Sequence, residues 1–339
     1  MSPRGEFAWI DRLVELLAEG GSGIGDDVAA VTDAGDGSLA WTIDTLVEGV
    51  HFRFDWMEPE AVGHRALAAS LSDLAAATAE PIGALVTAAG PAAVLEDRLE
   101  GVYGGLGELA RASGCMVMGG DLSRAEGPLH LTVTALGRCF GGTPPGRSGA
   151  RPGDDVWVTG RLGAPAAAMA LLRAAGDDPA GLATARAHPA TARLARPEPR
   201  VAEARWLAAR AELHATIDIS DGLSGDAAHV ADKSGARIAI EPALLPVHPA
   251  AVDAAAHAGG DALDWALHGG EEFELLVCAA AGALAPHADA FAGWFGIPLT
   301  RIGAVEPGSG VVRREDGRDS PLDVAAWDHF RVAPPDPRR

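Results

Sequence analysis

Aspartates recur in five short segments that combine small residues with an adjoining apolar run. The segments are GIGDD, TIDTL, SLSDLAA, GGDLS and DISDG, and they carry Asp26, Asp27, Asp44, Asp73, Asp121, Asp218 and Asp221. A carboxylate buried among apolar residues costs free energy unless it is paired or bound to a metal, and few arginines lie near these segments. Mg²⁺ prefers such oxygen ligands together with phosphate oxygens and water. If the segments converge, they form a site for a nucleoside triphosphate.

Glycines next to these aspartates favour the same interpretation, because backbone N–H groups at glycine can approach phosphate oxygens closely. They are Gly23, Gly25, Gly119 and Gly120. Each segment alone has a simpler structural interpretation, as a turn, as a polar position on a helix, or as the N-cap of a helix that begins near Leu223. The joint occurrence of the segments favours a metal and phosphate site.

The only lysine in the chain is Lys233. A Walker P-loop requires Gly-Lys-Ser/Thr and a protein kinase requires a strand lysine, so both classes are excluded. A Schiff-base enzyme would have to use Lys233, whose charged surroundings are typical of a surface residue. The motifs G-x-S-x-G, HExxH and paired cysteines are absent as well. The chemistry must therefore come from aspartate and glycine.

The 339 residues include 27 Lys and Arg against 47 Asp and Glu, a net charge of −20 at pH 7. This charge repels nucleic acids and anionic membranes, so we expect neither as a partner. The longest charge-free stretch, 81–95, is too short to span a bilayer, and the N-terminal segment lacks the features of a signal peptide. Cys115, Cys139 and Cys278 lie far apart in apolar segments, which is typical of buried thiols. We therefore expect a cytoplasmic protein.

The length favours two domains, and the Gly- and Pro-rich segment 141–155 separates them into 1–148 and 149–339. In the first half we expect helices over 6–18, 59–79 and 92–113, a glycine-rich loop over 19–27, and strands over 39–50, 115–120 and 129–140. In the second half we expect strands over 156–160, 215–219, 236–242, 273–279 and 300–307, helices over 164–175 and from Leu223, and a helical region interrupted by Pro189, Pro197 and Pro199. Because several strands follow one another directly, two α+β domains fit better than one Rossmann unit.

Nine motifs, spread in order from Gly5 to Phe330, resemble the thiamine-monophosphate kinase family. They are GEFAWIDRL, GIGDDVAAV, TIDTLVEGVHF, ALAASLSDLAA, MGGDLSR, RSGARPGDDVWVTG, IDISDGLSGD, HGGEEFELL and AWDHF. The resemblance implies that ATP phosphorylates thiamine monophosphate to thiamine diphosphate, with several Mg²⁺ ions bridging the two ligands. It also implies an α+β fold similar to aminoimidazole-ribonucleotide synthetase. The N-terminal ATP- and Mg²⁺-binding domain would dimerise through a shared barrel, and the C-terminal domain would be an α/β sandwich.

The resemblance assigns a role to each matching position. The implied metal ligands are Asp27, Thr42, Asp44, Asp73, Asp121, Asp218 and Asp221, and the implied catalytic residues among them are Asp44, Asp121 and Asp221. ATP would contact Gly120, Asp121, Arg147 and Ser220, and the thiamine moiety would contact His51, Glu271 and Trp327. The nucleophile would be a phosphate oxygen that is already ionised, so no general base is required.

Four positions depart from the family pattern: Ile43, Ser70, Glu272 and Phe273. Ile43 can offer a metal only its backbone carbonyl, and Phe273 lacks a phenol. Two alternatives stay open, namely another ATP-using member of the superfamily and a catalytically silent dimer that binds thiamine phosphates or nucleotides. A selenophosphate synthetase would have a reactive cysteine near its N-terminus, and none precedes Cys115. Another member of the superfamily, a hydrogenase-maturation protein, ends in cysteine, whereas this chain ends in PPDPRR.

Overall fold

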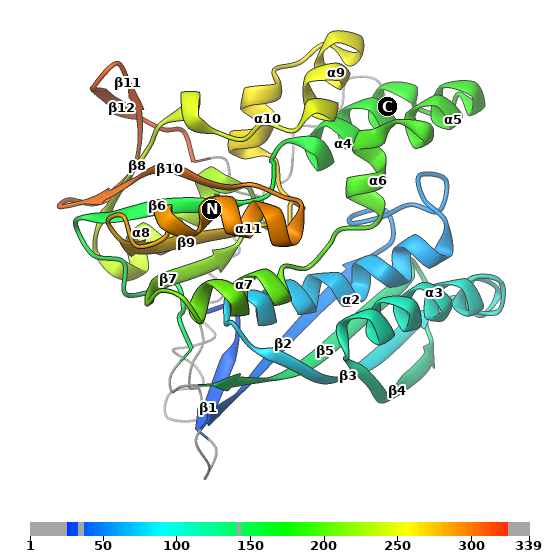
Figure 1. Ribbon diagram of the computed structural model, residues 1–339. Helices are drawn as coiled ribbons and strands as arrows, with labels where there is room; N and C mark the ends of the chain where they lie inside the picture. Colours follow the sequence, from blue (N-terminus) through cyan, green and yellow to red (C-terminus); the bar gives the residue numbers. More distant parts are fainter. Residues whose placement is uncertain (1–25, 33–36, 141–143, 325–339) are drawn as a thin grey trace, which may run out of the picture.

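Two mixed β-sheets, one from each half of the chain, organise the computed structural model (Figure 1). The structure describes residues 26–32, 37–140 and 144–324. The expected helix over 6–18, most of the glycine-rich loop and Trp327 lie outside these residues. None of the described helices combines the length and the apolarity needed to cross a bilayer.

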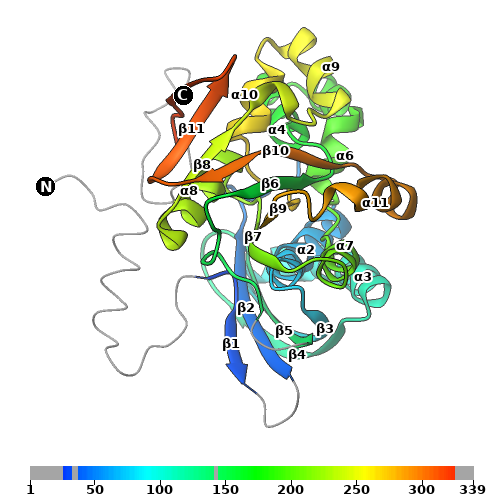
Figure 2. The ribbon, with the colours of Figure 1, turned by 60° about the vertical axis from the view of Figure 1, so that its left-hand side comes forward.

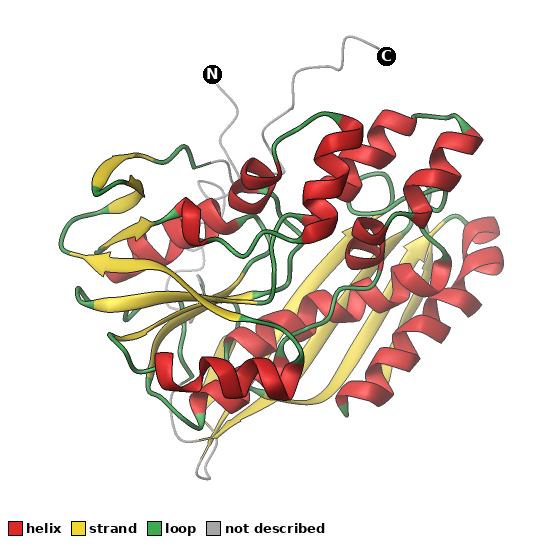
Figure 3. Ribbon diagram, turned by 45° about the horizontal axis from the view of Figure 1, so that its top comes forward, coloured by secondary structure: helices red, strands yellow, loops and turns green. Residues whose placement is uncertain are grey.

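The first sheet has the strand order β1-β2-β5-β3-β4, in which only β3 and β4 run parallel. Its strands are β1 (Ala29–Thr32), β2 (Gly37–Val47), β3 (Glu80–Gly90), β4 (Met116–Arg124) and β5 (His130–Phe140). Helices α2 (Pro59–Ala76) and α3 (Ala92–Ser113) cover one face (Figure 3). Along β2, Ala40 and Thr42 are buried toward the helices, whereas Trp41 and Ile43 are exposed. Because side chains alternate along a strand, the opposite face of this sheet is open.

Helix α2 lies between the two halves and contacts β2, β5, α3 and α7 (Figure 2). Pro59 occupies its first turn, where a missing N–H costs nothing, and small residues dominate its length. A Cβ on Gly63 would lie 1.7 Å from the Val102 carbonyl oxygen, and one on Gly105 would lie 1.8 Å from that of Glu60. Glycine at these positions therefore lets α2 and α3 pack closely, and nearly every residue of α2 is buried.

The second sheet has the strand order β12-β11-β8-β10-β6-β9-β7. Its strands are β6 (Asp154–Thr159), β7 (Leu213–Asp218), β8 (Arg237–Ile240), β9 (Leu275–Ala280), β10 (Leu299–Glu306), β11 (Gly310–Glu315) and β12 (Arg318–Pro321). The helices of this half are α4 (Ala164–Ala175), α5 (Pro179–Ala187), α6 (Pro189–Ala195), α7 (Val201–Ala208), α8 (Leu223–Ser234), α9 (Pro249–Ala258), α10 (Ala262–His268) and α11 (Ala288–Phe295), with short 3₁₀ turns at Pro242–Leu244 and Ala285–His287. Strand β6 is buried along its whole length, as expected for a central strand covered on both faces.

Most of the expected elements are confirmed, and the helices over 92–113 and 164–175 begin and end where they were predicted. Several boundaries were wrong: the strand expected over 39–50 spans Gly37–Val47, and strand β3 was not predicted. Helix α2 ends at Ala76, because Thr78 adopts a φ of 54° and β3 begins at Glu80. Strand β4 runs on to Arg124 instead of ending at 120, and β9 begins at Leu275 instead of 273 because Phe273 has a φ of 52°.

Candidate active site

Three carboxylates from distant parts of the chain meet between the two sheets. Asp27 precedes β1, Asp73 lies on α2, and Asp218 ends β7; we call these three residues the carboxylate cluster. One ligand atom from each lies within 4.8 Å of those of the other two. The convergence predicted for the aspartate segments is therefore confirmed for these three members. An all-carboxylate set at this spacing fits a hard cation such as Mg²⁺.

Hydroxyl groups from β2 and α2 hold in place two carboxylates of the cluster and the neighbouring carboxylate of Asp44. Ser70 Oγ donates to Asp44 Oδ2 over 2.9 Å, and Ser72 Oγ donates to Asp218 Oδ2 over 2.7 Å. Thr42 Oγ1 donates to Asp73 Oδ2. The alternation of β2 turns positions 42 and 44 toward α2, so the strand and the helix place hydroxyl and carboxylate groups against one another. Ser70, one of the four positions that depart from the family pattern, therefore donates a hydrogen bond to Asp44.

The metal-free cluster cannot ionise fully at low cost. Burial, opposed by Arg147, raises the pKa of Asp27 to about 6, and burial together with neighbouring carboxylates raises the pKa of Asp218 to about 8. Burial and the adjacent acids also raise the pKa values of Asp44 and Asp73. Of the described residues, Arg147 is the one cation paired with the cluster, through Nε and the Asp27 Oδ1 at 2.9 Å. A divalent cation would supply the positive charge that this set lacks.

These pKa values predict how pH and Mg²⁺ change the stability of the protein. Asp27 and Asp218 hold protons in the folded state above their ordinary pKa of 3.8, so their contribution to the free energy of unfolding falls between about pH 4 and pH 8. Mg²⁺ competes with these protons and should raise the melting temperature by about 3 °C more at pH 8 than at pH 6. Thermal unfolding with and without Mg²⁺ measures this difference. An equal Mg²⁺ effect at both pH values, or an unchanged effect in Asp218→Asn, would contradict it.

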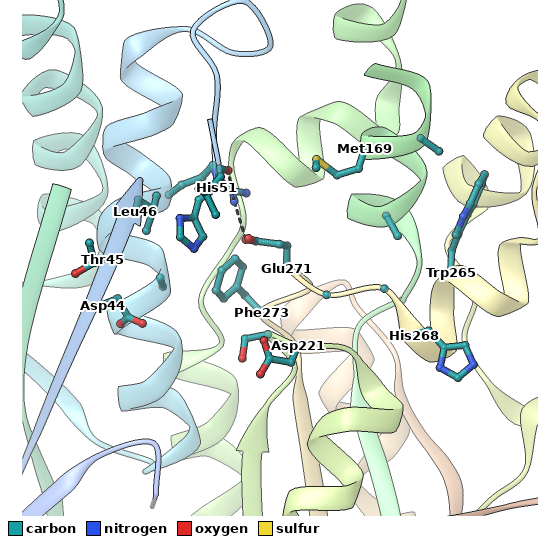
Figure 4. Close-up of a pocket in the computed structure, with 18 of the residues that line it drawn as sticks. Asp44, Thr45, Leu46, His51, Met169, Asp221, Trp265, His268, Glu271 and Phe273 are labelled. Atoms are coloured by element: carbon teal, nitrogen blue, oxygen red, sulfur yellow. Dashed lines mark hydrogen bonds and ion pairs between the residues drawn. The ribbon is translucent and has the colours of Figure 1, made fainter. Parts of the chain in front are cut away.

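A pocket of about 770 Å³ opens beside the cluster. Asp44, Ser220 and Asp221 line it together with His51 and Glu271. In Figure 4, His51 and Glu271 lie above Asp44 and Asp221. Val47 N–H donates to His51 Nδ1 over 2.9 Å, so the proton of a neutral ring is placed on Nε2. Two predicted metal ligands, Asp44 and Asp221, therefore line the same cavity as His51 and Glu271.

Glu271 reaches this pocket from a strained turn. Its φ is 66°, and its backbone N–H donates to the Ser220 carbonyl over 2.7 Å. The next residue, Glu272, is buried, and its Oε1 accepts the Gly163 N–H over 2.5 Å. Phe273, which also has a positive φ, lines the pocket. Glu272 and Phe273, which depart from the family pattern, thus belong to the same turn as Glu271. Glu272 anchors this turn to Gly163 at the start of α4.

The structure separates Asp121 from the cluster. Gly120 and Asp121 lie on the edge strand β4, and β5 and β3 stand between this strand and the Asp44 strand. In the strand register Asp121 shares a row with Thr45 on the open face, whereas Asp44 points toward α2. A Cβ on Gly120 would lie 1.8 Å from the Val86 carbonyl oxygen, so close strand packing already requires this glycine. Among the described residues, two groups of side chains have ligand atoms close enough to hold one metal ion, and Asp121 belongs to neither group.

Several residues near the site were not predicted. Two of them, Asp226 and His229, form with Asp221 a second group whose ligand atoms lie within 4.8 Å of one another. Asp226 accepts the Asp221 N–H over 3.2 Å. The pocket is also lined by Arg65, Met169, Trp265 and His268. Arg65 could have been found, because a charge inside the apolar stretch GHRALAAS requires a buried partner. The sequence pattern around the other lining residues is that of ordinary helices.

Residues 25–139 match the family model of the AIR synthase related protein, N-terminal domain, and residues 151–315 match that of its C-terminal domain. Two α+β halves with carboxylates gathered between them thus define a two-domain protein of this class.

More specific relatives lie within this class. The thiamine-monophosphate kinase of Mycobacterium tuberculosis is 37% identical over 278 residues, which cover 81% of this chain and 80% of the relative. That of Escherichia coli K12 is 36% identical over 336 residues, covering 96% and 98%. A solved structure described as AaThiL complexed with AMPPCP and TMP matches with a TM-score of 0.82 and 32% identity, covering 96% and 97%. The chain belongs to the thiamine-monophosphate kinase family.

Proposed function

We propose that this protein transfers the γ-phosphoryl group of ATP to thiamine monophosphate and forms thiamine diphosphate. The observation that carries the proposal is a buried carboxylate cluster beside a pocket large enough for an organic phosphate. Family membership supports it, because relatives that match over most of their length are thiamine-monophosphate kinases. The absence of a Walker lysine agrees with a site in which carboxylates and metal ions replace it.

In this mechanism the protein positions two phosphorylated ligands and moves no proton. The acceptor phosphate oxygen is ionised at neutral pH, so no described carboxylate has to act as a base. Mg²⁺, when bound, supplies charge neutralisation between the two polyanions. The residues that would hold the metal ions are Asp27, Thr42, Asp44, Asp73, Asp121, Asp218 and Asp221. In-line attack then needs no phosphoenzyme, and Asp44, Asp121 and Asp221 act closest to the transferred group.

The two ligands occupy different ends of the site. ATP contacts Gly120, Asp121, Arg147 and Ser220, with the Arg147 guanidinium shared between Asp27 and the polyphosphate. His51 and Glu271 hold the thiamine moiety, joined by Trp327 from the C-terminal segment. A boundary between residues 148 and 149 separates the dimerising ATP and Mg²⁺ domain from the C-terminal α/β sandwich. The three buried free thiols are consistent with a cytoplasmic location.

A second copy of the chain completes the site. The open face of the first sheet exposes Trp41, Ile43 and Leu85, each by more than 40%. Strand β4, whose outer edge pairs with no other described strand, exposes Met116 and Leu122 to a similar extent. A contiguous apolar face beside a free strand edge is a dimerisation surface, and two such sheets close into a shared barrel. Because Asp121 lies on this face, it reaches a carboxylate cluster only from the partner copy.

The first test is turnover by the purified protein with ATP, Mg²⁺ and thiamine monophosphate. We expect thiamine diphosphate and ADP in equal amounts, and no ADP when thiamine monophosphate is omitted. ADP without thiamine diphosphate would indicate another superfamily substrate. No ADP under any condition would indicate a silent binding protein. Chromatographic separation of both products distinguishes the outcomes.

A further inference from the structure

Arg65 is a buried cation on α2 whose partners come from three other segments. Its side chain is 2% exposed. Nη2 donates to Glu271 Oε2 over 2.6 Å and to the His51 carbonyl over 3.4 Å, and Nη1 donates to the Leu194 carbonyl on α6. One guanidinium thus contacts both pocket residues assigned to the thiamine moiety. The dashed line to Glu271 in Figure 4 marks the ion pair.

The ion pair fixes the direction of a carboxylate that the backbone alone holds in a strained position. Glu271 has a φ of 66°, and its side chain is 32% exposed toward the pocket. Arg65 occupies Oε2, and no described residue donates to Oε1. The Glu271 side chain is only partly buried, so without Arg65 its carboxylate would be free to turn toward solvent. Arg65 therefore keeps one oxygen of Glu271 aimed at the cavity.

We propose that Arg65 is the positioning residue of the thiamine end of the pocket, holding the Glu271 carboxylate and the His51 backbone in register for a cationic heteroaromatic ligand. This inference rests on the proposed function and deepens it. It assigns Arg65 no contact with the transferred phosphoryl group, because its partners are Glu271 and two backbone carbonyls. Its loss should weaken binding of thiamine monophosphate and leave the chemical step and ATP binding unchanged.

The test is a double-mutant cycle between Arg65 and Glu271. In Arg65→Met the KM for thiamine monophosphate should rise about tenfold or more, with kcat and the KM for ATP within about twofold of wild type. In a Glu271→Gln background the same substitution should raise that KM clearly less than it does in the wild-type background, because the ion pair is already lost. Arg65→Lys keeps the charge and one hydrogen bond, and it should restore part of the affinity. If Arg65→Met does not fold, the cycle with Arg65→Lys decides.

Arg196→Met is the matched control. Arg196, the C-cap residue of α6, also bridges the two halves, through Glu108 at 3.0 Å, but it lies outside this pocket. Its replacement should leave the KM for thiamine monophosphate unchanged. An unchanged KM in Arg65→Met, a fall in kcat alone, or an equal KM increase in the Glu271→Gln background would each overturn the inference.

Calorimetric titration with thiamine monophosphate separates this inference from the proposed function. A wild-type protein that binds the ligand but forms no thiamine diphosphate would refute the kinase activity. Weaker binding by Arg65→Met in that case still supports the positioning role, and equal binding overturns it. A wild-type protein that does not bind the ligand overturns both.

Discussion

Asp44→Asn is expected to lower kcat for thiamine diphosphate formation on the order of 10² to 10³-fold at saturating Mg²⁺. Asparagine keeps the size of the side chain and can still accept the hydrogen bond from Ser70 Oγ, which is 2.9 Å from the carboxylate. It removes the negative charge that a bridging metal ion requires. The fold should remain intact, because burial already raises the pKa of Asp44 and makes its charge costly in the metal-free protein. Steady-state kinetics across a Mg²⁺ series measures the effect.

Two control variants separate this loss from general damage. His51→Asn should act mainly on the KM for thiamine monophosphate and reduce kcat far less than Asp44→Asn, since His51 lines the pocket as a proposed contact of the thiamine moiety and not as a metal ligand. Asp178→Asn should have no effect on either constant. Asp178 caps α5 by accepting the Gly181 N–H over 2.8 Å, which asparagine can also do. Near-normal turnover by Asp44→Asn at ordinary Mg²⁺ concentrations would refute the metal-bridge account.

The sequence predicted that its aspartate segments converge, because the cost of burying charge makes aspartates in apolar segments informative; the structure confirms this for Asp27, Asp73 and Asp218 and not for Asp121. It also predicted that α2 carries Asp73, since the helix has a proline start and a long run of small residues. The hydroxyl partners were not predicted. Serine is common on helices, and the hydrogen bond from Ser72 to Asp218 joins residues 146 positions apart. Such a contact depends on how the two halves pack, which local patterns do not encode.

The turn at Glu271 was missed for a different reason. The apolar run that follows it predicts a strand from 273, and β9 does begin two residues later at Leu275. Hydrogen bonds to Ser220 and Ile219 carbonyls hold Glu271 and Phe273 at positive φ. Non-glycine residues rarely adopt this conformation, so propensity favours the extended form. Tertiary contacts override propensity here, and strained residues of this kind concentrate at functional sites.

In the proposed dimer, Asp121 would reach the site from the partner copy. The motif GGDLS was expected where a strand ends at 120, but it lies within β4, which is the edge strand of its sheet. All residues of β4 are exposed in the isolated chain, although Met116 and Leu122 are apolar. Sequence motifs group residues that serve one reaction, whichever copy of the chain supplies them. Asp121 therefore bears directly on the assembly.

Heterodimers of Asp44→Asn with Asp121→Asn are expected to recover about half of the wild-type activity, although each homodimer is nearly inactive. In a symmetric dimer with exchanged Asp121 residues, one site of the heterodimer receives both substitutions and the other receives none. Two different affinity tags allow the heterodimer to be isolated, and a doubly tagged wild-type dimer sets the reference. Activity no higher than that of the homodimers would show that Asp121 does not cross to the partner.

The reciprocal pairing gives the opposite expectation and makes the result decisive. When the double variant Asp44→Asn/Asp121→Asn is paired with a wild-type chain, each site lacks one of the two carboxylates, so this heterodimer should be nearly inactive. If Asp121 served its own chain, the wild-type chain would keep a complete site and about half of the activity would remain. The two heterodimers contain the same substitutions in the same number. Their activities can therefore differ only through which chain supplies Asp121 to the cluster beside Asp44.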